Sequence, residues 1–225
     1  VASIGSYAFS ECTRLQKVYI SESSGGNGRK NGVYDITLPA SLESIDSYAF
    51  YKAITSTSAS VQCSESLKTI GNNAFDGASW ITSFDYVGDA CALESIGDSA
   101  FYGCSRLRFS TRSVPSNPAV TLGAASNVLL RALEKETLTS IGAKAYKDCN
   151  YTSYKITLQI KESLESIGEY AFQNCVAIQN IEFLDSKPTL GTGAFYNCSS
   201  LKKVSYKSSI SSDTEQYEDS KETSL

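Results

Sequence analysis

Residues 164–183 read LESIGEYAFQNCVAIQNIEF, and this stretch decides the fold because the chain repeats its pattern of apolar residues. Small and apolar side chains stand in it at fixed offsets, namely Leu164, Ile167, Gly168, Ala171, Phe172, Cys175, Ile178, Ile181 and Phe183. The same order returns, with conservative exchanges, throughout the chain. Its aromatic position is held by Phe9, Phe50, Phe75, Phe101, Tyr146, Phe172 and Phe195.

Most of these aromatic residues are about 23–26 residues apart, and two longer steps indicate insertions. A unit of this length carries one apolar face that it cannot bury alone, so neighbouring units must stack on one another. The spacing therefore predicts one elongated solenoid of about seven coils.

Each unit divides into three parts. The LxxI segment is a short extended stretch, and the glycine after it, replaced once by Asp46, suggests a turn with a left-handed backbone position. The AF pair then predicts a tight helical turn that buries the aromatic ring. In the last part, Ile181 and Phe183 alternate with Asn180 and Glu182, which is typical of a half-buried strand. Stacked strands of this kind predict a parallel sheet.

Some units depart from this frame. Phe109 in the fourth unit, and Ile156 and Leu158 in the fifth, are one position out of phase with the apolar residues of the sixth. A one-residue slip reverses which side chains face the core, so we expect a local bulge or an altered turn there. Residues 54–63 favour a strand but show no clear register.

The phrase LxxIGxxAFxxCxxLxxVxI resembles the BspA-like, or Treponema pallidum-type, leucine-rich repeat over residues 1–206. The resemblance implies an α/β repeat solenoid, that is, a right-handed superhelix with one parallel β-sheet, short helical turns and about seven repeats. Proteins with such repeats are typically found on the surfaces of bacteria and some parasitic protists, where they are implicated in adhesion. The resemblance therefore implies an extracellular or cell-surface location for this chain.

The domain organisation follows from the repeats. Residues 1–206 form the predicted solenoid, and residues 207–225, with two lysines against five carboxylates, form a flexible acidic tail or linker. Because Val1 already occupies an apolar repeat position, we expect the chain to be a segment of a longer protein.

Two insertions interrupt the repeats. Residues 21–35 are rich in glycine, serine and asparagine and predict a loop or hairpin. Residues 113–136 end in a short amphipathic helix, with leucines at helical spacing behind an N-cap at Ser126. Insertions in repeat proteins often emerge on a binding face, and the alternative is a neutral loop expansion.

Five of the seven cysteines share one repeat position, three residues after the aromatic: Cys12, Cys104, Cys149, Cys175 and Cys198. Alanine fills this position in two other units, so the position favours a small buried side chain. Cys63 and Cys91 lie outside this column, and a disulfide between them is left open.

Several function classes are disfavoured by composition. The chain has no histidine, which excludes Ser-His-Asp and Cys-His catalysis, and the sequence predicts no enzyme, cofactor or metal site. A net charge of −4 without a basic stripe argues against nucleic acid as a partner. No apolar run is long enough to predict a membrane span.

The outward positions of the predicted strands are the candidate binding residues: Lys17, Tyr19, Ser83, Asp85, Asn180, Glu182, Lys203 and Ser205. Trp80 joins them because other repeats place arginine or serine at its position, which predicts partial exposure. The alternatives are a plain solvated sheet surface and, for Trp80, packing over the irregular second repeat.

The function predicted from these observations is non-catalytic binding of a protein or glycan on a host or neighbouring cell. One alternative is a structural spacer or assembly unit that associates end to end. Another is the targeting arm of a larger surface enzyme.

Overall fold

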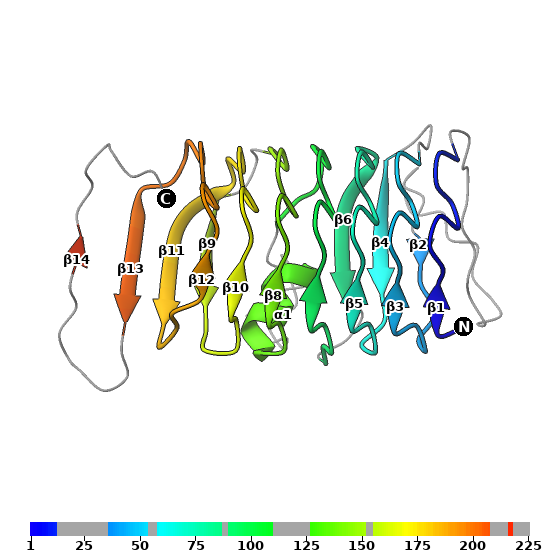
Figure 1. The fold of residues 1–225 in the computed structure, drawn as a ribbon, viewed down its shortest axis with the longest axis horizontal. Helices are drawn as coiled ribbons and strands as arrows, with labels where there is room; N and C mark the ends of the chain where they lie inside the picture. Colours follow the sequence, from blue (N-terminus) through cyan, green and yellow to red (C-terminus); the bar gives the residue numbers. More distant parts are fainter. Residues whose placement is uncertain are drawn as a thin grey trace, which may run out of the picture.

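The structure is a computed structural model that describes residues 1–12, 36–53, 58–86, 90–109, 127–151, 155–207 and 216–217. These residues wind into one elongated solenoid, whose coils follow one another in chain order along the long axis (Figure 1). The described residues are mostly strands and turns, with one helix, α1 (Val128–Lys135). The predicted repeat solenoid with stacked parallel strands is confirmed.

Each LxxI segment forms a two-residue strand, and together these strands make one seven-stranded parallel sheet. In order they are β1 (Ser3–Ile4), β3 (Ser44–Ile45), β5 (Thr69–Ile70), β7 (Ser95–Ile96), β8 (Ser140–Ile141), β10 (Ser166–Ile167) and β12 (Thr189–Leu190). The register is continuous, since each hydroxyl residue lies opposite the hydroxyl residue of the next coil. The inward residue is a buried isoleucine in every strand except β12.

The longer strands, together with the two-residue strands β2 and β14, form two further sheets instead of the single sheet expected from the sequence. One contains β2 (Ile36–Thr37), β4 (Ala59–Cys63) and β6 (Ile81–Tyr86). The other contains β9 (Ile156–Ile160), β11 (Ile178–Leu184), β13 (Lys203–Lys207) and β14 (Gln216–Tyr217), of which β14 pairs antiparallel to β13. Helix α1 packs against both β6 and β9 and so separates the two sheets (Figure 1).

Each of these two sheets contains one register shift. In β11, Gln179 is an extra residue relative to β9, and in β6, Thr82 is an extra residue relative to β4. The bulge expected for the fifth unit is therefore present, but the extra residue belongs to the strand of the sixth unit. Residues 59–63, which showed no register in the sequence, form the regular strand β4, whose buried and half-buried residues alternate.

The turns around the aromatic residues are not helical, contrary to the prediction. Their backbone N–H groups donate across to the next coil, as Phe50 N does to the carbonyl of Ala74 at 2.7 Å. The expected left-handed glycine is also wrong, because positive φ occurs two residues after it, at Tyr48 and Asn73 for example. Each coil thus continues the hydrogen-bond ladder through its turn.

The repeat glycine has a different role, which is to let neighbouring backbones come close. A Cβ added at Gly71 would lie 2.6 Å from the backbone nitrogen of Ser47 in the preceding coil, far inside any normal contact. At Gly5, in the first coil, an added Cβ would meet nothing within 4 Å. The requirement for glycine therefore comes from the preceding coil.

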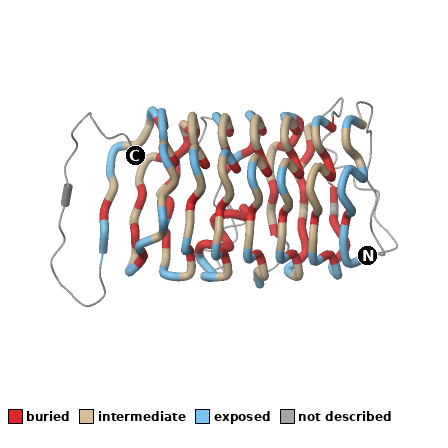
Figure 2. The backbone as a smooth tube through the Cα atoms, viewed as in Figure 1, coloured by how far each residue is buried: buried red, intermediate tan, exposed pale blue. Residues whose placement is uncertain are grey.

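Aromatic rings stack through the centre of the solenoid. Successive rings of this column have centroids 5.0 to 5.4 Å apart, at Phe9, Phe50, Phe75, Phe101, Tyr146, Phe172 and Phe195. Figure 2 shows buried segments recurring from coil to coil. Stacked buried rings stabilise the fold by burial of apolar area and by ring contacts.

The cysteine column runs beside the rings, and the prediction of buried thiols is confirmed for four of its members. Each thiol donates to the carbonyl oxygen of the aromatic residue in the preceding coil, at 2.9 to 3.2 Å, for Cys104, Cys149, Cys175 and Cys198. Cys63 and Cys91 are both free thiols.

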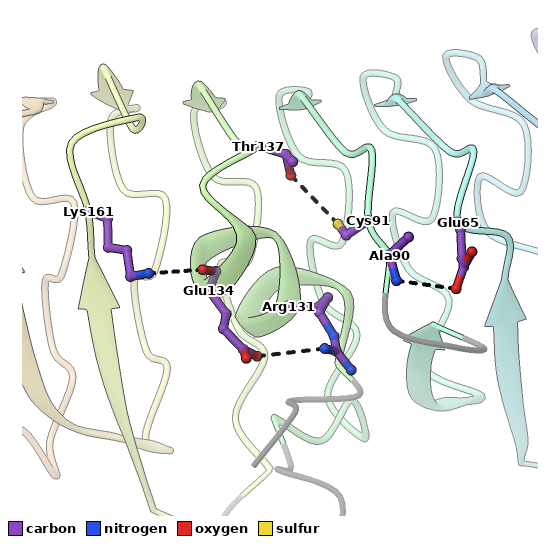
Figure 3. A network of polar contacts seen from close by, with 7 residues as sticks. All are labelled: Glu65, Ala90, Cys91, Arg131, Glu134, Thr137 and Lys161. Carbon is purple, nitrogen blue, oxygen red and sulfur yellow. Dashed lines mark hydrogen bonds and ion pairs between the residues drawn. The ribbon is translucent and has the colours of Figure 1, made fainter.

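The second insertion ends in α1, as predicted, but its N-cap is Asn127 and not Ser126. The Asn127 side chain accepts hydrogen bonds from the N–H groups of Leu129 and Leu130, at 3.0 and 3.3 Å. Lys161 donates to the Glu134 carbonyl at 2.9 Å and holds the end of the helix against the solenoid (Figure 3). Helix α1 therefore packs as part of the solenoid, against β6 and β9. The rest of the two insertions, residues 21–35 and 113–126, lies outside the described residues.

We expect Gly71→Ala to destabilise the fold by about 1–3 kcal/mol, because the added methyl group overpacks the contact with Ser47. The matched control, Gly5→Ala, adds the same methyl group to open space and should be neutral or slightly stabilising. Urea denaturation of dilute samples measures both effects. Equal midpoints for the two variants would contradict the role given to the glycine column.

Stability should also fall at alkaline pH. Burial raises the pKa of the Cys149 and Cys175 thiols well above the usual value, and raises the pKa of Cys198 to about 12. When the pH is below about 8.5, the usual thiol pKa, these thiols are protonated in both the folded and the unfolded chain. Above that pH, the thiols lose their protons in the unfolded chain only. Each thiol therefore lowers the free energy of unfolding by about 1.4 kcal/mol per pH unit. For Cys198, the loss should continue until the pH reaches about 12.

This pH dependence is checked by urea denaturation between about pH 8 and pH 10, above the usual thiol pKa. The double variant Cys175→Ala with Cys198→Ala should lose stability less steeply than the parent chain. Alanine is suited to the test because Ala53 and Ala78 already occupy this column. Parallel slopes for the two proteins would show that the buried thiols do not cause the effect.

Candidate binding face

The candidate site is the outward surface of β9, β11 and β13, here called the C-terminal polar face. It consists of Thr157, Gln159, Asn180, Glu182, Lys203, Ser205 and Lys207. In β9 and β11 these side chains alternate with buried residues such as Leu158 and Ile181 and so point away from the core, whereas Ser205 of β13 is itself buried. The backbone pairing places Asn180 between Thr157 and Lys203, and Glu182 between Gln159 and Ser205.

Hydrogen bonds across the strands hold this face in place. The Gln159 amide donates to one Glu182 oxygen at 3.1 Å, and the Lys207 ammonium contacts the other at 3.1 Å. The Asn180 amide donates to the Thr157 hydroxyl at 3.0 Å. Neighbouring coils are therefore linked through their outward side chains as well as through their backbones.

Glu182 is the electrostatic centre of the face. The hydrogen bond from Gln159, followed by that from Lys207, lowers the pKa of its carboxyl group, and the charge of Lys203 makes a smaller contribution in the same direction. The carboxylate thus stays ionised, and the neighbouring Lys207 ammonium group offsets part of its negative charge. Lys203 is exposed and forms no ion pair that the structure describes, so the face presents a surplus of positive charge and hydrogen-bond donors.

The structure brings only some of the predicted site residues together. Asn180, Glu182, Lys203 and Ser205 share the C-terminal polar face, although Ser205 is 4% exposed and lies opposite Gln216 of β14.

The remaining predicted strand residues do not join this group. Ser83 and Asp85 lie on β6, beside Ser60 and Gln62 of β4, and α1 separates that sheet from the C-terminal polar face. Lys17 and Tyr19 lie outside the described residues, so their placement remains a prediction.

The predicted exposure of Trp80 is wrong. Its side chain is 4% exposed, and its indole N–H donates to the Ala53 carbonyl at 2.7 Å, so it packs onto the second coil. Exposure could not be predicted from the other repeats because residues at this repeat position differ in burial. Ala177, for example, occupies the same position and is also buried. Trp80 belongs to the core.

Three residues of the C-terminal polar face were missed in the sequence. Thr157 and Gln159 were not predicted because the fifth unit is out of phase with the others. The one-residue slip seen in the sequence was the signal that different positions of this unit face outward. Lys207 was assigned to the tail, although it continues the alternation of Lys203 and Ser205.

The seven-stranded sheet adds a second outward feature that the sequence analysis did not identify. Its strands align one hydroxyl side chain from every coil: Ser3, Ser44, Thr69, Ser95, Ser140, Ser166 and Thr189. Exposed charged residues flank this column, and Lys68 and Glu43 form an ion pair of 2.9 Å between adjacent coils. Two-residue strands carry no alternating pattern, which is why this sheet was not predicted.

Metal and membrane sites were also sought. Within the described residues, no group of three or more cysteine and carboxylate side chains is arranged to hold a metal ion. The same part of the chain contains no helix of the length and apolarity needed to span a bilayer.

Stacked parallel coils with a leucine, isoleucine, glycine and aromatic framework define a leucine-rich-repeat solenoid. The chain belongs to the BspA type leucine rich repeat family, whose model matches in six copies over residues 1–31, 28–117 and 130–219. No curated protein matches the sequence.

Similar solved structures come from bacteria. A leucine rich repeat protein of Treponema pallidum is 18% identical, with a TM-score of 0.49 over 77% of this chain and 70% of that chain. A leucine rich cell surface protein of Faecalibacterium prausnitzii is 22% identical, with a TM-score of 0.49 over 83% and 52%. A leucine-rich repeat protein of Bacteroides ovatus is 19% identical, with a TM-score of 0.32 over 92% and 59%.

We expect Gln159→Ala to raise the pKa of Glu182, because it removes the hydrogen bond that lowers this pKa most. The control Lys203→Ala removes only a smaller charge effect and should raise it less. Carbon-detected NMR titration of the Glu182 carboxyl group measures both. A larger rise with Lys203→Ala would mean that charge, and not the Gln159 hydrogen bond, governs this carboxylate.

Proposed function

We propose that the chain is a non-catalytic binding module that recognises a protein or glycan through the C-terminal polar face. The observation that carries this proposal is the arrangement of outward polar side chains from three parallel strands in one register. Cross-strand contacts through Glu182 and Asn180 hold Gln159, Thr157 and Lys207 in place before a ligand arrives. Binding to groups already held in place costs less entropy than binding to mobile ones.

The chemistry of the face suits a ligand rich in oxygen acceptors. Lys203 and the Gln159 amide are exposed donors. Lys155, just before β9, adds an exposed cation whose ammonium group donates to the Ser200 hydroxyl at 2.6 Å and to the Val176 carbonyl at 2.7 Å. Carboxylates, backbone carbonyls and sugar hydroxyls all accept from such groups. The single acidic group, Glu182, is already bonded within the face, so it does not repel an anionic ligand strongly.

The proposed location is the cell surface or the extracellular space, and the proposed ligand lies on a host or neighbouring cell. This part of the proposal comes from the resemblance of the repeats to the BspA type. The role of residues 207–225 as a linker likewise remains a proposal, since only Lys207, at the end of β13, and Gln216–Tyr217, as β14, are described in this stretch.

The test is an array of matrix proteins and glycans probed with the folded chain and with Lys203→Glu. We expect Lys203→Glu to weaken binding at least tenfold, because it reverses the exposed charge of the face, and Asn180→Ala to weaken it less. Lys144→Glu makes the same charge change at an exposed turn outside the three strands and serves as the matched control. Circular dichroism confirms that each variant is folded.

Binding that Lys203→Glu leaves unchanged would move the site away from this face. Equal losses for Lys203→Glu and Lys144→Glu would indicate a dependence on net charge alone. Trp80→Ala is not used as a probe, because Trp80 is buried and its loss would change the fold.

A further inference from the structure

One row of turn residues changes character in the middle of the solenoid. These residues stand just before the cysteine column, and their backbone φ is positive in every coil. They are Glu11, Lys52, Gly77, Gly103, Asp148, Asn174 and Asn197. The third and fourth coils therefore carry no side chain at a position that the other coils fill.

The fold does not require glycine at both of these places. Lys52 and Asp148 adopt the same left-handed conformation, with φ of 47° and 62°. At Gly103, an added Cβ would meet only the Cα of Gly77, at 4.0 Å, which is an ordinary contact. The repeat glycines differ, since an added Cβ at Gly71 collides with the preceding coil. Gly77 and Gly103, here called the glycine gap, thus leave open a space that packing does not demand.

Serines lie on one side of the glycine gap. Ser79 and Ser105 follow the two glycines at the same distance in sequence, and both are exposed. Their backbone N–H groups donate to the carbonyls of Gly77 and Gly103, each at 2.8 Å. These short turns hold the serines beside the gap, where each hydroxyl group can donate and accept a hydrogen bond.

A carboxylate lies on the other side. Asp76 is half-buried, and its side chain forms no hydrogen bond or ion pair within the described residues. Burial raises the pKa of Asp76, and the charge of Lys52 opposes this effect. The Asp76 charge also raises the pKa of Cys104, the residue after Gly103, although burial is the larger cause. Asp76 therefore lies near the gap with unused capacity to accept hydrogen bonds.

The tyrosine on this side has its ring held in place. The Lys147 ammonium group lies 5.6 Å from the centroid of the half-buried Tyr102 ring, and Lys52 lies 4.8 Å from that of Tyr51. Cation–π contacts of this kind fix side chains at the surface. An added Cβ at Gly77 would come within 3.3 Å of Lys52 Cγ, so the stem of Lys52 forms one end of the gap.

Asp148 forms the other end of the gap, and its carboxylate accepts a hydrogen bond from the Asn174 amide at 2.5 Å. Two carboxylates and two ammonium groups thus surround the gap, so their charges balance. This set suits a neutral ligand that both donates and accepts hydrogen bonds. A sugar ring has this chemistry, because its hydroxyl groups bond to carboxylate, ammonium and seryl groups while its C–H surface packs on an aromatic ring.

A peptide strand fits this place less well. Peptides that bind by their backbone need an open strand edge. Here the backbone N–H groups of Gly77 and Gly103 already donate to the next coil, at 2.8 and 2.9 Å. Recognition must therefore come from side chains.

We propose that the glycine gap binds one neutral sugar ring of a glycan, stacked on Tyr102 and hydrogen-bonded by Asp76 and Lys52. The gap spans two coils whose core rings, Phe75 and Phe101, have centroids 5.3 Å apart, which suits a single ring. This site lies on the turns of the third and fourth coils, away from the C-terminal polar face. It does not depend on the function proposed for that face.

The first test is a glycan array probed with the folded chain and with Gly103→Asn. Asparagine suits this position, because Asn174 and Asn197 hold it in other coils with the same positive φ. The variant should therefore keep the fold, which circular dichroism checks, while its side chain fills the gap. We expect it to bind the retained glycans at least tenfold more weakly, and Lys203→Glu to bind those glycans unchanged.

A matched pair of variants tests the stacking surface. Tyr102→Ala removes the ring beside the gap and should weaken binding of the same glycans at least tenfold. Tyr196→Ala removes a tyrosine at the same repeat position, next to Asn197, where no gap exists, and should leave binding unchanged.

The second test locates the ligand. Methyl glycosides of glucose, galactose, mannose and N-acetylglucosamine are titrated to millimolar concentration into labelled protein. At least one should shift the amide NMR signals of Gly77, Gly103 and Ser105 more than any signal of the C-terminal polar face. Asp76→Asn should weaken that glycoside severalfold, because it removes the charged acceptor while keeping the shape of the side chain.

Any of three results would overturn the proposal. One is an array in which Gly103→Asn binds every glycan as the parent chain does. Another is a set of glycosides that shift no amide signal in the gap. The third is a peptide from a matrix protein that shifts Gly77 and Gly103 where no glycoside does, which would assign the gap to a protein partner.

Discussion

The whole structure depends on the close approach of consecutive backbones. Hydrogen bonds run from coil to coil through both the short strands and the turns, and the glycine column allows this spacing. The ring column and the thiol column then fill the interior at the same repeat distance. Because no coil buries its apolar face alone, a change in one coil acts through its two neighbours, and stability is a property of contacts between coils more than of any single coil.

Because the interior holds the coils together, a binding site is expected among the outward side chains. Interior positions are committed to packing, as Trp80 shows, since an aromatic residue that suggested a recognition site is bonded to Ala53 inside the solenoid. The outward positions of the longer strands carry no such constraint, and they differ from coil to coil. On the C-terminal polar face, Glu182 and Asn180 convert this variable surface into a bonded array. Helix α1 interrupts the outer sheets and so limits the array to one half of the molecule.

The repeat pattern was sufficient to predict the solenoid, its buried rings and its buried thiols, because these follow from apolar spacing alone. It did not predict the seven-stranded sheet, since strands such as Ser44–Ile45 are too short to show alternation and exist only through their neighbours. Four predicted face residues came together because strand alternation near Ile181 is regular. Thr157 and Gln159 were missed because the sequence shows the phase slip of the fifth unit but not the bulge at Gln179, which decides which residues of β9 and β11 lie opposite each other.

The buried thiols also impose an order on biosynthesis. In the folded chain, Cys149 and Cys175 are enclosed and hydrogen-bonded, and their raised pKa suppresses the thiolate form that reacts with disulfides and oxidants. Before the coils stack, the same side chains are accessible and react as ordinary thiols. In an oxidising compartment, coil stacking must therefore proceed faster than thiol oxidation. A disulfide formed early between two cysteines of the column would prevent the next coil from packing. Folding speed, and not only final stability, is then a condition for obtaining this molecule.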